Sequence, residues 1–203
     1  MRYNIKDDFD KLEKAGITSY GLMINISSTQ NANDFFVGEN DTEKYRTIEV
    51  TLENHIDKDG EEITELCGSA TCILITTFDE VTGRTLNYLE VIDSIDQDMY
   101  NCLSVFMDKN YEFNEELMFS QICYIDRMII NKKYRHLGLG SILLEYIKYK
   151  FANMLTAIVL EPLAFELNNE NKELFEKESE QLSLFYKKHG FMKYRVNTWL
   201  YHE

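Results

Sequence analysis

The residues with the clearest chemistry form a short turn with the pattern R-x-x-G-x-G: Arg135, His136, Leu137, Gly138, Leu139 and Gly140. Glycines let the backbone approach a ligand closely and adopt conformations that other residues avoid. A segment with helical spacing follows the turn, and the free N–H groups and dipole of a helix N-terminus favour an anion. The pattern therefore predicts a site for a phosphate group. The neighbouring Lys132 and Lys133 either attract that phosphate or lie in solvent, and the sequence leaves both options open.

The elements around this turn are those of an α/β protein. The second half of the chain is expected to form a strand, a helix, a strand, a helix and a strand, at residues 122–130, 141–154, 156–165, 181–189 and 191–201. Pro162 should interrupt strand pairing, and Gly190 should end the second helix. This alternation predicts a partly parallel sheet flanked by helices.

The first half of the chain gives a looser pattern, with a helix at 6–14, a strand at 20–27, a polar loop at 30–44, strands at 47–56 and 70–78 joined through a turn at 57–60, and a helix at 87–109. The acidic stretch 166–178 is expected to be an exposed insertion. We predict one domain over residues 1–203, with a core at about 121–201 and a variable N-terminal half at about 1–115.

Composition limits the class of protein. A hydrophobic content of 44% with only one proline indicates an ordinary globular protein with one core. The net charge of -14 disfavours nucleic acid or an anionic membrane as a partner and weakly favours a cationic one. With a charged N-terminus and no apolar run of ~20 residues, the chain is expected to be cytoplasmic.

The four cysteines, Cys67, Cys72, Cys102 and Cys123, form no C-x-x-C pair, and no histidine lies at zinc-ligand spacing from them. We therefore expect reduced core thiols and no metal site.

A second pattern follows one strand and one helix downstream, where Leu184-Phe185-Tyr186 precedes Gly190-Phe191. Together with Ile130 and the glycine-rich turn, it resembles the two signatures of the GNAT superfamily of acyl-coenzyme A-dependent N-acetyltransferases. The resemblance covers roughly Gln121 to Tyr201. It implies the GNAT fold, a mixed, twisted sheet splayed at the cofactor site, and acetyl-CoA or a related acyl-CoA as co-substrate.

The resemblance also implies where the coenzyme lies. Backbone N–H groups from His136 to Ser141 would hold its pyrophosphate, and Met128 and Ile130 would offer backbone groups to the pantetheine arm. Ser179 stands where many relatives have an asparagine that contacts the cofactor. It either makes that contact through its hydroxyl or is the N-cap of the following helix.

The implied reaction is direct transfer of an acyl group from the thioester to a primary amine. Tyr186 matches the usual proton donor to the departing sulfur. Glu161 resembles a strand glutamate that acts as the base in some relatives. Asp126 is the alternative base, placed by two-residue alternation on the face of Met128 and Ile130. Ordered water is a third option.

The acceptor stays open between a small molecule, a peptide N-terminus and a lysine side chain. A catalytically idle acyl-CoA sensor or scaffold is the competing function, and an interaction module with a vestigial pocket is a third. Oligomeric state, including a homodimer, cannot be predicted from the sequence.

Overall fold

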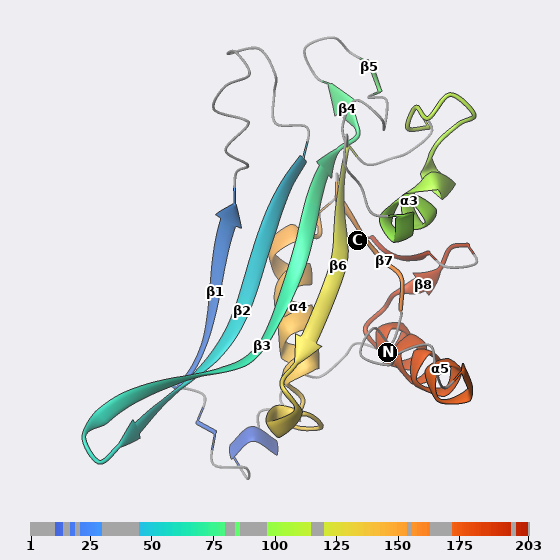
Figure 1. The fold of residues 1–203 in the computed structure, drawn as a ribbon. Helices are drawn as coiled ribbons and strands as arrows, with labels where there is room; N and C mark the ends of the chain where they lie inside the picture. Colours follow the sequence, from blue (N-terminus) through green and yellow to red (C-terminus); the bar gives the residue numbers. More distant parts are fainter. Residues whose placement is uncertain are drawn as a thin grey trace.

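A mixed sheet with helices on both faces forms the body of the protein in the computed structural model (Figure 1). The structure describes residues 11–13, 17–18, 21–29, 45–79, 84–85, 97–114, 120–153, 156–162, 172–195 and 198–202. The strands of the main sheet are β1 (Leu22–Thr29), β2 (Tyr45–Lys58), β3 (Glu61–Thr76), β6 (Gln121–Ile130), β7 (Thr156–Leu160), β8 (Met192–Lys193) and β9 (Trp199–Tyr201). The helices are α3 (Gln97–Leu103), α4 (Leu139–Phe151), α5 (Lys172–Lys188) and the 3-10 turns η2 (Ser104–Phe106) and η3 (Lys132–Tyr134). A separate pair consists of β4 (Phe78–Asp79) and β5 (Arg84–Thr85).

The strand order of the main sheet is β1-β2-β3-β6-β7-β9-β8 within the described residues. β6 and β7 run parallel, and the other neighbouring strands run antiparallel. The parallel pair is joined through α4, as a right-twisted sheet requires of a crossover. The predicted α/β class with a partly parallel sheet is confirmed.

The two faces of the sheet carry different cores. α4 covers one face, where Leu143 and Ile147 pack in a cluster with Ile125 and Ile158. α3 covers part of the other face, where Met99 and Leu103 pack with Ile122, Tyr124 and Val159. In Figure 1, α3 lies to the right of β6, and α4 lies on the other side, behind β3 and β6. All five residues of β7 are buried, because this strand is covered on both faces.

A β-bulge interrupts β6 at its middle. Thr71 of β3 pairs with Arg127 and Cys72 pairs with Ile125, so Asp126 is an extra residue without a counterpart. The extra residue reverses the alternation of side chains. Met128 and Ile130 consequently pack against the α4-side cluster that contains Ile125. The prediction that Asp126 shares a face with Met128 and Ile130 is therefore wrong.

β2 and β3 form a hairpin longer than predicted. Asp59 and Gly60 have φ angles of 59° and 86°, as a primed two-residue turn requires. β3 begins directly after the turn, whereas the sequence predicted a strand only from Ala70. The first residues of β3 are mostly exposed and charged, so they lack the hydrophobic alternation that marks a strand packed on a core.

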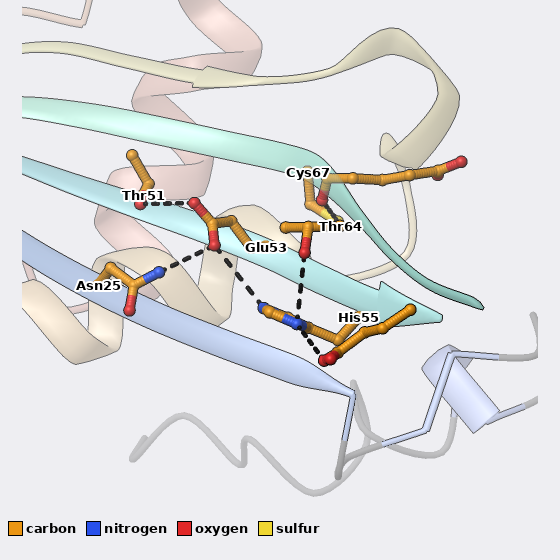
Figure 2. A network of polar contacts seen from close by, with 8 residues as sticks. Asn25, Thr51, Glu53, His55, Thr64 and Cys67 are labelled. Atoms are coloured by element: carbon orange, nitrogen blue, oxygen red, sulfur yellow. Dashed lines mark hydrogen bonds and ion pairs between the residues drawn. The ribbon is translucent and has the colours of Figure 1, made fainter. Parts of the chain in front are cut away.

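Polar contacts connect the strands of this hairpin with β1 (Figure 2). The Asn25 amide donates to the Glu53 carboxylate at 2.9 Å, which joins β1 to β2. His55 Nδ1 lies 3.0 Å from the Glu62 carboxylate and 3.4 Å from the Thr64 hydroxyl, which joins β2 to β3. These contacts stabilise a part of the sheet that the helices do not cover.

Several predicted boundaries differ from the structure. β7 ends at Leu160, before the proline that was expected to stop pairing, and residues 163–165 of the predicted strand lie outside the described residues. The predicted final strand is two short strands, β8 and β9, that pair with each other. α4 spans Leu139–Phe151, whereas the sequence predicted a helix at 141–154.

The helical predictions elsewhere are partly confirmed. Of the helix predicted at 87–109, α3 and η2 cover 97–106, and residues 87–96 lie outside the described residues. Residues 11–13 are helical within the segment predicted at 6–14, and the rest of that segment and the loop at 30–44 lie outside the described residues. The strand predicted at 20–27 is β1.

α5 corrects the predicted acidic insertion. The helix begins at Lys172, so residues 172–178 form its first two turns instead of an exposed insertion. Residues 166–171 lie outside the described residues. The consequence for Ser179 is direct: it lies inside a helix, so the interpretation of Ser179 as an N-cap is wrong.

Candidate functional site

The glycine-rich turn leads from β6 into α4. Gly138 is the N-cap of α4 with φ of 87°, a left-handed conformation that favours glycine, and His136 is also left-handed with φ of 64°. The first backbone bond of the helix runs from Ile142 N–H to the Gly138 carbonyl at 3.1 Å. The N–H groups of Leu139, Gly140 and Ser141 therefore have no acceptor within the helix. They are available to an anion at the α4 N-terminus.

The side chains of the turn hold it in place. Arg135 Nε donates to the Ile130 carbonyl at 2.9 Å, which fastens the turn to the end of β6. Leu137 and Leu139 pack in a cluster with Leu12 and Ile142. The side chains of the predicted turn residues thus anchor the turn to β6 and to this cluster. The backbone N–H groups at the α4 N-terminus remain available to a ligand.

Of the two lysines that the sequence left open, Lys133 has a fixed partner. Its Nζ lies 2.6 Å from the Glu65 carboxylate of β3, and the Tyr134 hydroxyl donates to the same carboxylate. Hydrogen bonds from Lys133 and Tyr134 hold the pKa of Glu65 below its ordinary value. Lys133 therefore braces the turn against β3.

β6 and β7 part beside this turn. Their pairing ends at Ile125 and Leu160, so β6 continues beyond the end of β7 (Figure 1). Met128 and Ile130 lie on that continuation, on the α4 side. The structure thus brings the turn, Met128 and Ile130 to one place, as the sequence predicted.

Tyr186 of α5 lies on the same side of the sheet. Its ring contacts the rings of Phe185 and Phe191, with centroids 5.2 and 5.6 Å away, and the residue is 7% exposed. Among the described residues its hydroxyl has no hydrogen-bond partner. Burial raises the pKa of Tyr186 above its ordinary value of 10, which keeps the phenol protonated.

The two candidate bases lie together on the opposite face. In the parallel pair, Tyr124 aligns with Val159 and Ile125 aligns with Leu160, and the next residues are Asp126 and Glu161. Tyr124 and Val159 pack on the α3 side, so the two carboxylates follow on that side, where the strands part. Asp126 and Glu161 thus follow the last paired residues of two neighbouring strands on the α3 side, whereas Met128 and Ile130 face α4.

Burial and charge act on these carboxylates. Glu161 is half-buried, and desolvation together with Asp98 in the first turn of α3 raises its pKa to about 7. The phenol of Tyr124 lies within the field of the same groups: burial first, and then Cys102, Asp126 and Glu161, raise its pKa. The charges of Asp98, Asp126 and Glu161 thus all act on one buried tyrosine.

Ser179 is buried at its hydroxyl. The oxygen has no hydrogen-bond partner among the described residues. It lies seven residues before Tyr186, which places both side chains on one face of α5. A buried hydroxyl without a partner is uncommon and suits a contact with a ligand.

A buried chain of polar groups, which the sequence did not predict, joins α4 to the end of α5. His189 Nε2 lies 3.1 Å from the Ser141 hydroxyl, and His189 Nδ1 lies 2.7 Å from the Glu145 carboxylate. Lys148 donates to Glu145 at 2.9 Å and to the His189 carbonyl at 2.8 Å. The sequence could have indicated one part of this arrangement, because Ser141 and Glu145 are four residues apart and lie on one helical face. No local pattern in the sequence indicated that His189 would contact that face.

Comparison with known proteins identifies the family. The sequence profile of the acetyltransferase (GNAT) domain matches residues 92–193, just over half of the chain. The chain belongs to the GNAT acetyltransferase family. In this GNAT protein the matched region contains the glycine-rich turn, both candidate bases and Tyr186. No protein with a curated description matches the chain.

Solved structures give a weaker likeness. NAA60 of Arabidopsis thaliana in complex with acetyl-CoA is 13% identical with a TM-score of 0.40, over 89% of this chain and 100% of that one. AtaTR bound with AcCoA is 13% identical with a TM-score of 0.37, over 90% of this chain and 93% of that one. The KacTA–DNA complex is 14% identical with a TM-score of 0.39, over 88% of this chain and 92% of that one. Likenesses this low carry no argument about ligands or partners.

Two further features are absent from the part of the chain that the structure describes. No group of three or more His, Cys, Asp or Glu side chains there is placed to hold a metal ion. No helix in the described part is long and apolar enough to cross a membrane. All four cysteines are free and buried, as expected.

Proposed function

We propose that this GNAT protein transfers the acetyl group of acetyl-CoA directly to a primary amine. The observation that carries the proposal is the left-handed Gly138 turn, which opens α4 beside the part of β6 that has no β7 partner. Free helix N–H groups suit a diphosphate, and a strand edge without a partner suits an extended amide-containing arm. The two features are adjacent, as one ligand carrying both groups requires.

The residues present fit coenzyme A. The N–H groups from Leu139 to Ser141 would hold its diphosphate, and the backbone of Met128 and Ile130 would bind its pantetheine arm. The buried hydroxyl of Ser179 would gain a partner. When bound, the coenzyme supplies an acyl group already activated as a thioester.

The protein's own residues would move the protons. Tyr186 is protonated at neutral pH and is held in a buried position, so its hydroxyl is suited to donate a proton to a leaving sulfur. Glu161, with a pKa of about 7, is suited to take a proton from an amine near neutral pH. Tyr186 packs in the cluster on the α4 side and Glu161 lies near Asp98 of α3, so donor and base would act from opposite faces of the sheet.

A cationic amine is the acceptor class that this site favours. Asp98, Asp126 and Glu161 give the α3 side of the strand ends a negative field, as their joint effect on Tyr124 indicates. The pKa of Glu161 is raised first by burial and then by repulsion from Asp98, and a bound cation would relieve the repulsion. An ammonium group would therefore bind here and then lose its proton to the base.

Calorimetry with acetyl-CoA, followed by release of free thiol with a panel of amines, tests the proposal. We expect micromolar binding, and turnover with diamines or basic peptides. Tyr186→Phe should bind acetyl-CoA within about threefold of wild type and lose turnover by ~10²–10⁴-fold, because only proton donation is removed. Tyr149→Phe, at a residue on α4 that is 80% exposed, is the matched control and should behave as wild type.

Two outcomes would contradict the proposal. Absence of acetyl-CoA binding at high micromolar concentration would exclude the coenzyme site. Binding without thiol release for any amine would support the idle sensor instead of the enzyme.

A further inference from the structure

Hydrogen bonds to β3 hold the segment that leads into the proposed coenzyme site. The Asn131 N–H donates to the Cys67 carbonyl at 2.8 Å, and the Asn131 side-chain amide donates to the Leu66 carbonyl at 2.9 Å. Further along the chain, the Tyr134 hydroxyl donates to the Glu65 carboxylate. The first two bonds fix the residue that follows β6, and the last one fixes the end of η3, which leads into the glycine-rich turn.

β3 is itself firmly placed where it receives these bonds. It has a β-bulge at Cys67, an extra residue in the pairing with β2, and the next residue, Gly68, pairs with Ile130 of β6. A Cβ added at Gly68 would lie 2.6 Å from the Ile130 side chain, closer than packed atoms come. Glycine thus lets β3 and the end of β6 lie in close contact. Glu65, which is opposite Asn54 in the register with β2, therefore reaches η3 from a strand that is held in place.

Tyr134 connects Glu65 with α4. It is 5% exposed and packs in the cluster that contains Leu139 and Ile142, at the beginning of α4. A tyrosine hydroxyl in such a position needs a hydrogen-bond partner. The nearby thiol of Cys67, whose pKa burial raises to about 11, stays protonated and is a weak acceptor. Among the described residues, the Glu65 carboxylate is therefore the strong acceptor for this hydroxyl.

Lys133 contributes less to this arrangement. Its Nζ lies 2.6 Å from the same carboxylate, but its side chain is 66% exposed. An exposed ion pair of this kind adds little to the free energy of folding, because water solvates both charges in its absence. The hydrogen bond from Tyr134 is shielded from water by the cluster around it, so this bond is the one that holds the turn.

We infer that Glu65 is a positioning residue of the coenzyme site, which holds the first turn of α4 in its binding conformation through the Tyr134 hydroxyl. This inference rests on the proposed function. Without this acceptor, the hydroxyl would turn toward water, and the turn would populate conformations that do not bind a diphosphate. The apparent affinity would then fall in proportion to the competent fraction. Proton transfer would be unaffected, because Tyr186 packs in a different cluster and Glu161 lies on the α3 side.

Two substitutions of equal charge isolate the role of the acceptor. Glu65→Leu and Glu65→Gln both remove a negative charge, which by itself acts on an anionic ligand, but only glutamine keeps an oxygen for the Tyr134 hydroxyl. In calorimetry, Glu65→Gln should bind acetyl-CoA within about threefold of wild type, and Glu65→Leu about tenfold more weakly than Glu65→Gln, because one hydrogen bond changes the competent fraction by about this factor. Glu61→Leu, at an exposed glutamate of the same strand, is the control and should bind as wild type does.

Tyr134→Phe tests the same bond from its other end without a change of charge, and it should weaken acetyl-CoA binding by a similar factor. The double variant Glu65→Leu/Tyr134→Phe should bind no more weakly than either single variant, because all three lack the same bond. If the losses of the two single variants multiply in the double variant, the residues act independently and the inference is wrong. Tyr134→Phe against wild type decides if Glu65→Leu fails to fold.

A truncated donor separates positioning of the turn from a general loss of structure. S-Acetylpantetheine carries the thioester but no diphosphate, so Glu65→Leu should keep the wild-type kcat/KM with this donor. With acetyl-CoA the same variant should show a KM raised by about tenfold and a kcat within about twofold of wild type. An equal loss of kcat/KM with both donors would make Glu65 a residue of the fold alone and overturn the inference.

The failures are distinguishable. If wild type does not bind acetyl-CoA, the proposed function and this inference are both wrong. If wild type binds acetyl-CoA and releases thiol, but all the variants bind it equally well, the proposed function stands and only the role of Glu65 is wrong. If wild type binds acetyl-CoA without releasing thiol, the enzyme is excluded, and calorimetry on the variants still decides the role of Glu65.

Discussion

Glu161 stands at the end of a buried strand, and its pKa is well above that of a glutamate in water. Burial and one neighbouring charge are enough to cause this shift. Leu160 before it is buried and Asp98 of α3 lies nearby, so burial and a like charge act together to raise its pKa to about 7. The ordinary value is 4.5. One side chain thus gives the protein two pH dependences, one in activity and one in stability.

Glu161→Gln tests both. If Glu161 is the base, turnover of wild type rises with pH through about 7, because the carboxylate must be ionised to accept a proton. The variant should lose ~10²–10⁴-fold in turnover at pH 8 and lose that rise. A profile of kcat/KM from pH 5 to 9 measures this, with Glu61→Gln at the far end of the hairpin as the control. An unchanged profile would favour water or Asp126 as the base.

The stability of the same variant has a defined sign. Between pH 4.5 and about 7 the folded protein keeps the Glu161 proton while the unfolded chain releases it, so this group lowers stability as the pH rises. Gln keeps the neutral form at every pH. Urea unfolding should therefore find the variant more stable than wild type at pH 8 and no different at pH 4.

At the level of the elements, the turn into α4 uses its two glycines for different reasons. Gly138 needs glycine for its φ of 87°, which is a requirement of the fold. At Gly140 an added Cβ would lie 3.6 Å from Ile130 and 3.8 Å from Phe185, which is ordinary contact. The fold therefore tolerates a side chain at 140, and the proposed function explains the glycine there by the close approach of the coenzyme.

The two positions should respond oppositely to alanine. Gly138→Ala should lower the free energy of unfolding by ~1–2 kcal/mol, because it strains a left-handed residue. Gly140→Ala should leave stability unchanged or raise it by up to ~1 kcal/mol, since alanine favours helix, while acetyl-CoA affinity falls by at least about tenfold through a lost N–H contact. Urea unfolding and calorimetry on both variants check this. Undiminished affinity in Gly140→Ala would mean that the coenzyme does not approach the backbone there.

The sequence predicted those elements whose local pattern matches their tertiary surroundings. β6, the turn and α4 have a clear pattern, and the structure confirms them within two or three residues. The polar start of α5 and the exposed half of β3 lack a buried face, so periodicity could not reveal them. The bulge at Asp126 exists only through pairing with β3, and the His189 chain only through the packing of α5 on α4. Those features require a tertiary structure.

Over the whole molecule, charge opposes one of the two proposed substrates and favours the other. The net charge is -14, so a polyanionic coenzyme approaches against the field of the protein, and a cationic amine approaches with it. At the turn, the N–H groups without an acceptor in the helix and the helix dipole would attract the coenzyme locally against this field. Salt, which screens the long-range field beyond about 10 Å at 0.1 M, should therefore act on the two substrates with opposite signs.

Raising NaCl from about 0.05 to about 0.3 M tests this balance. KM for a diamine or basic peptide should rise by roughly threefold or more, and KM for acetyl-CoA should fall, with kcat little changed. A peptide acceptor without lysine or arginine is the control and should show a smaller change. Equal changes of the same sign for both substrates would show that the field of the whole protein does not guide them.

The single extra residue in β6 divides this strand into two parts with opposite side-chain alternation. Before Asp126 the even-numbered positions face α3, and after it the even-numbered positions face α4. A deletion of Asp126 would close the bulge, because Ile125 and Arg127 already pair with Cys72 and Thr71, which are adjacent on β3. Arg127 would then follow Ile125 directly, and Met128 and Ile130 would keep their place on the α4 side. The register against β3, and not the number of residues in β6, therefore decides which side chains face α4.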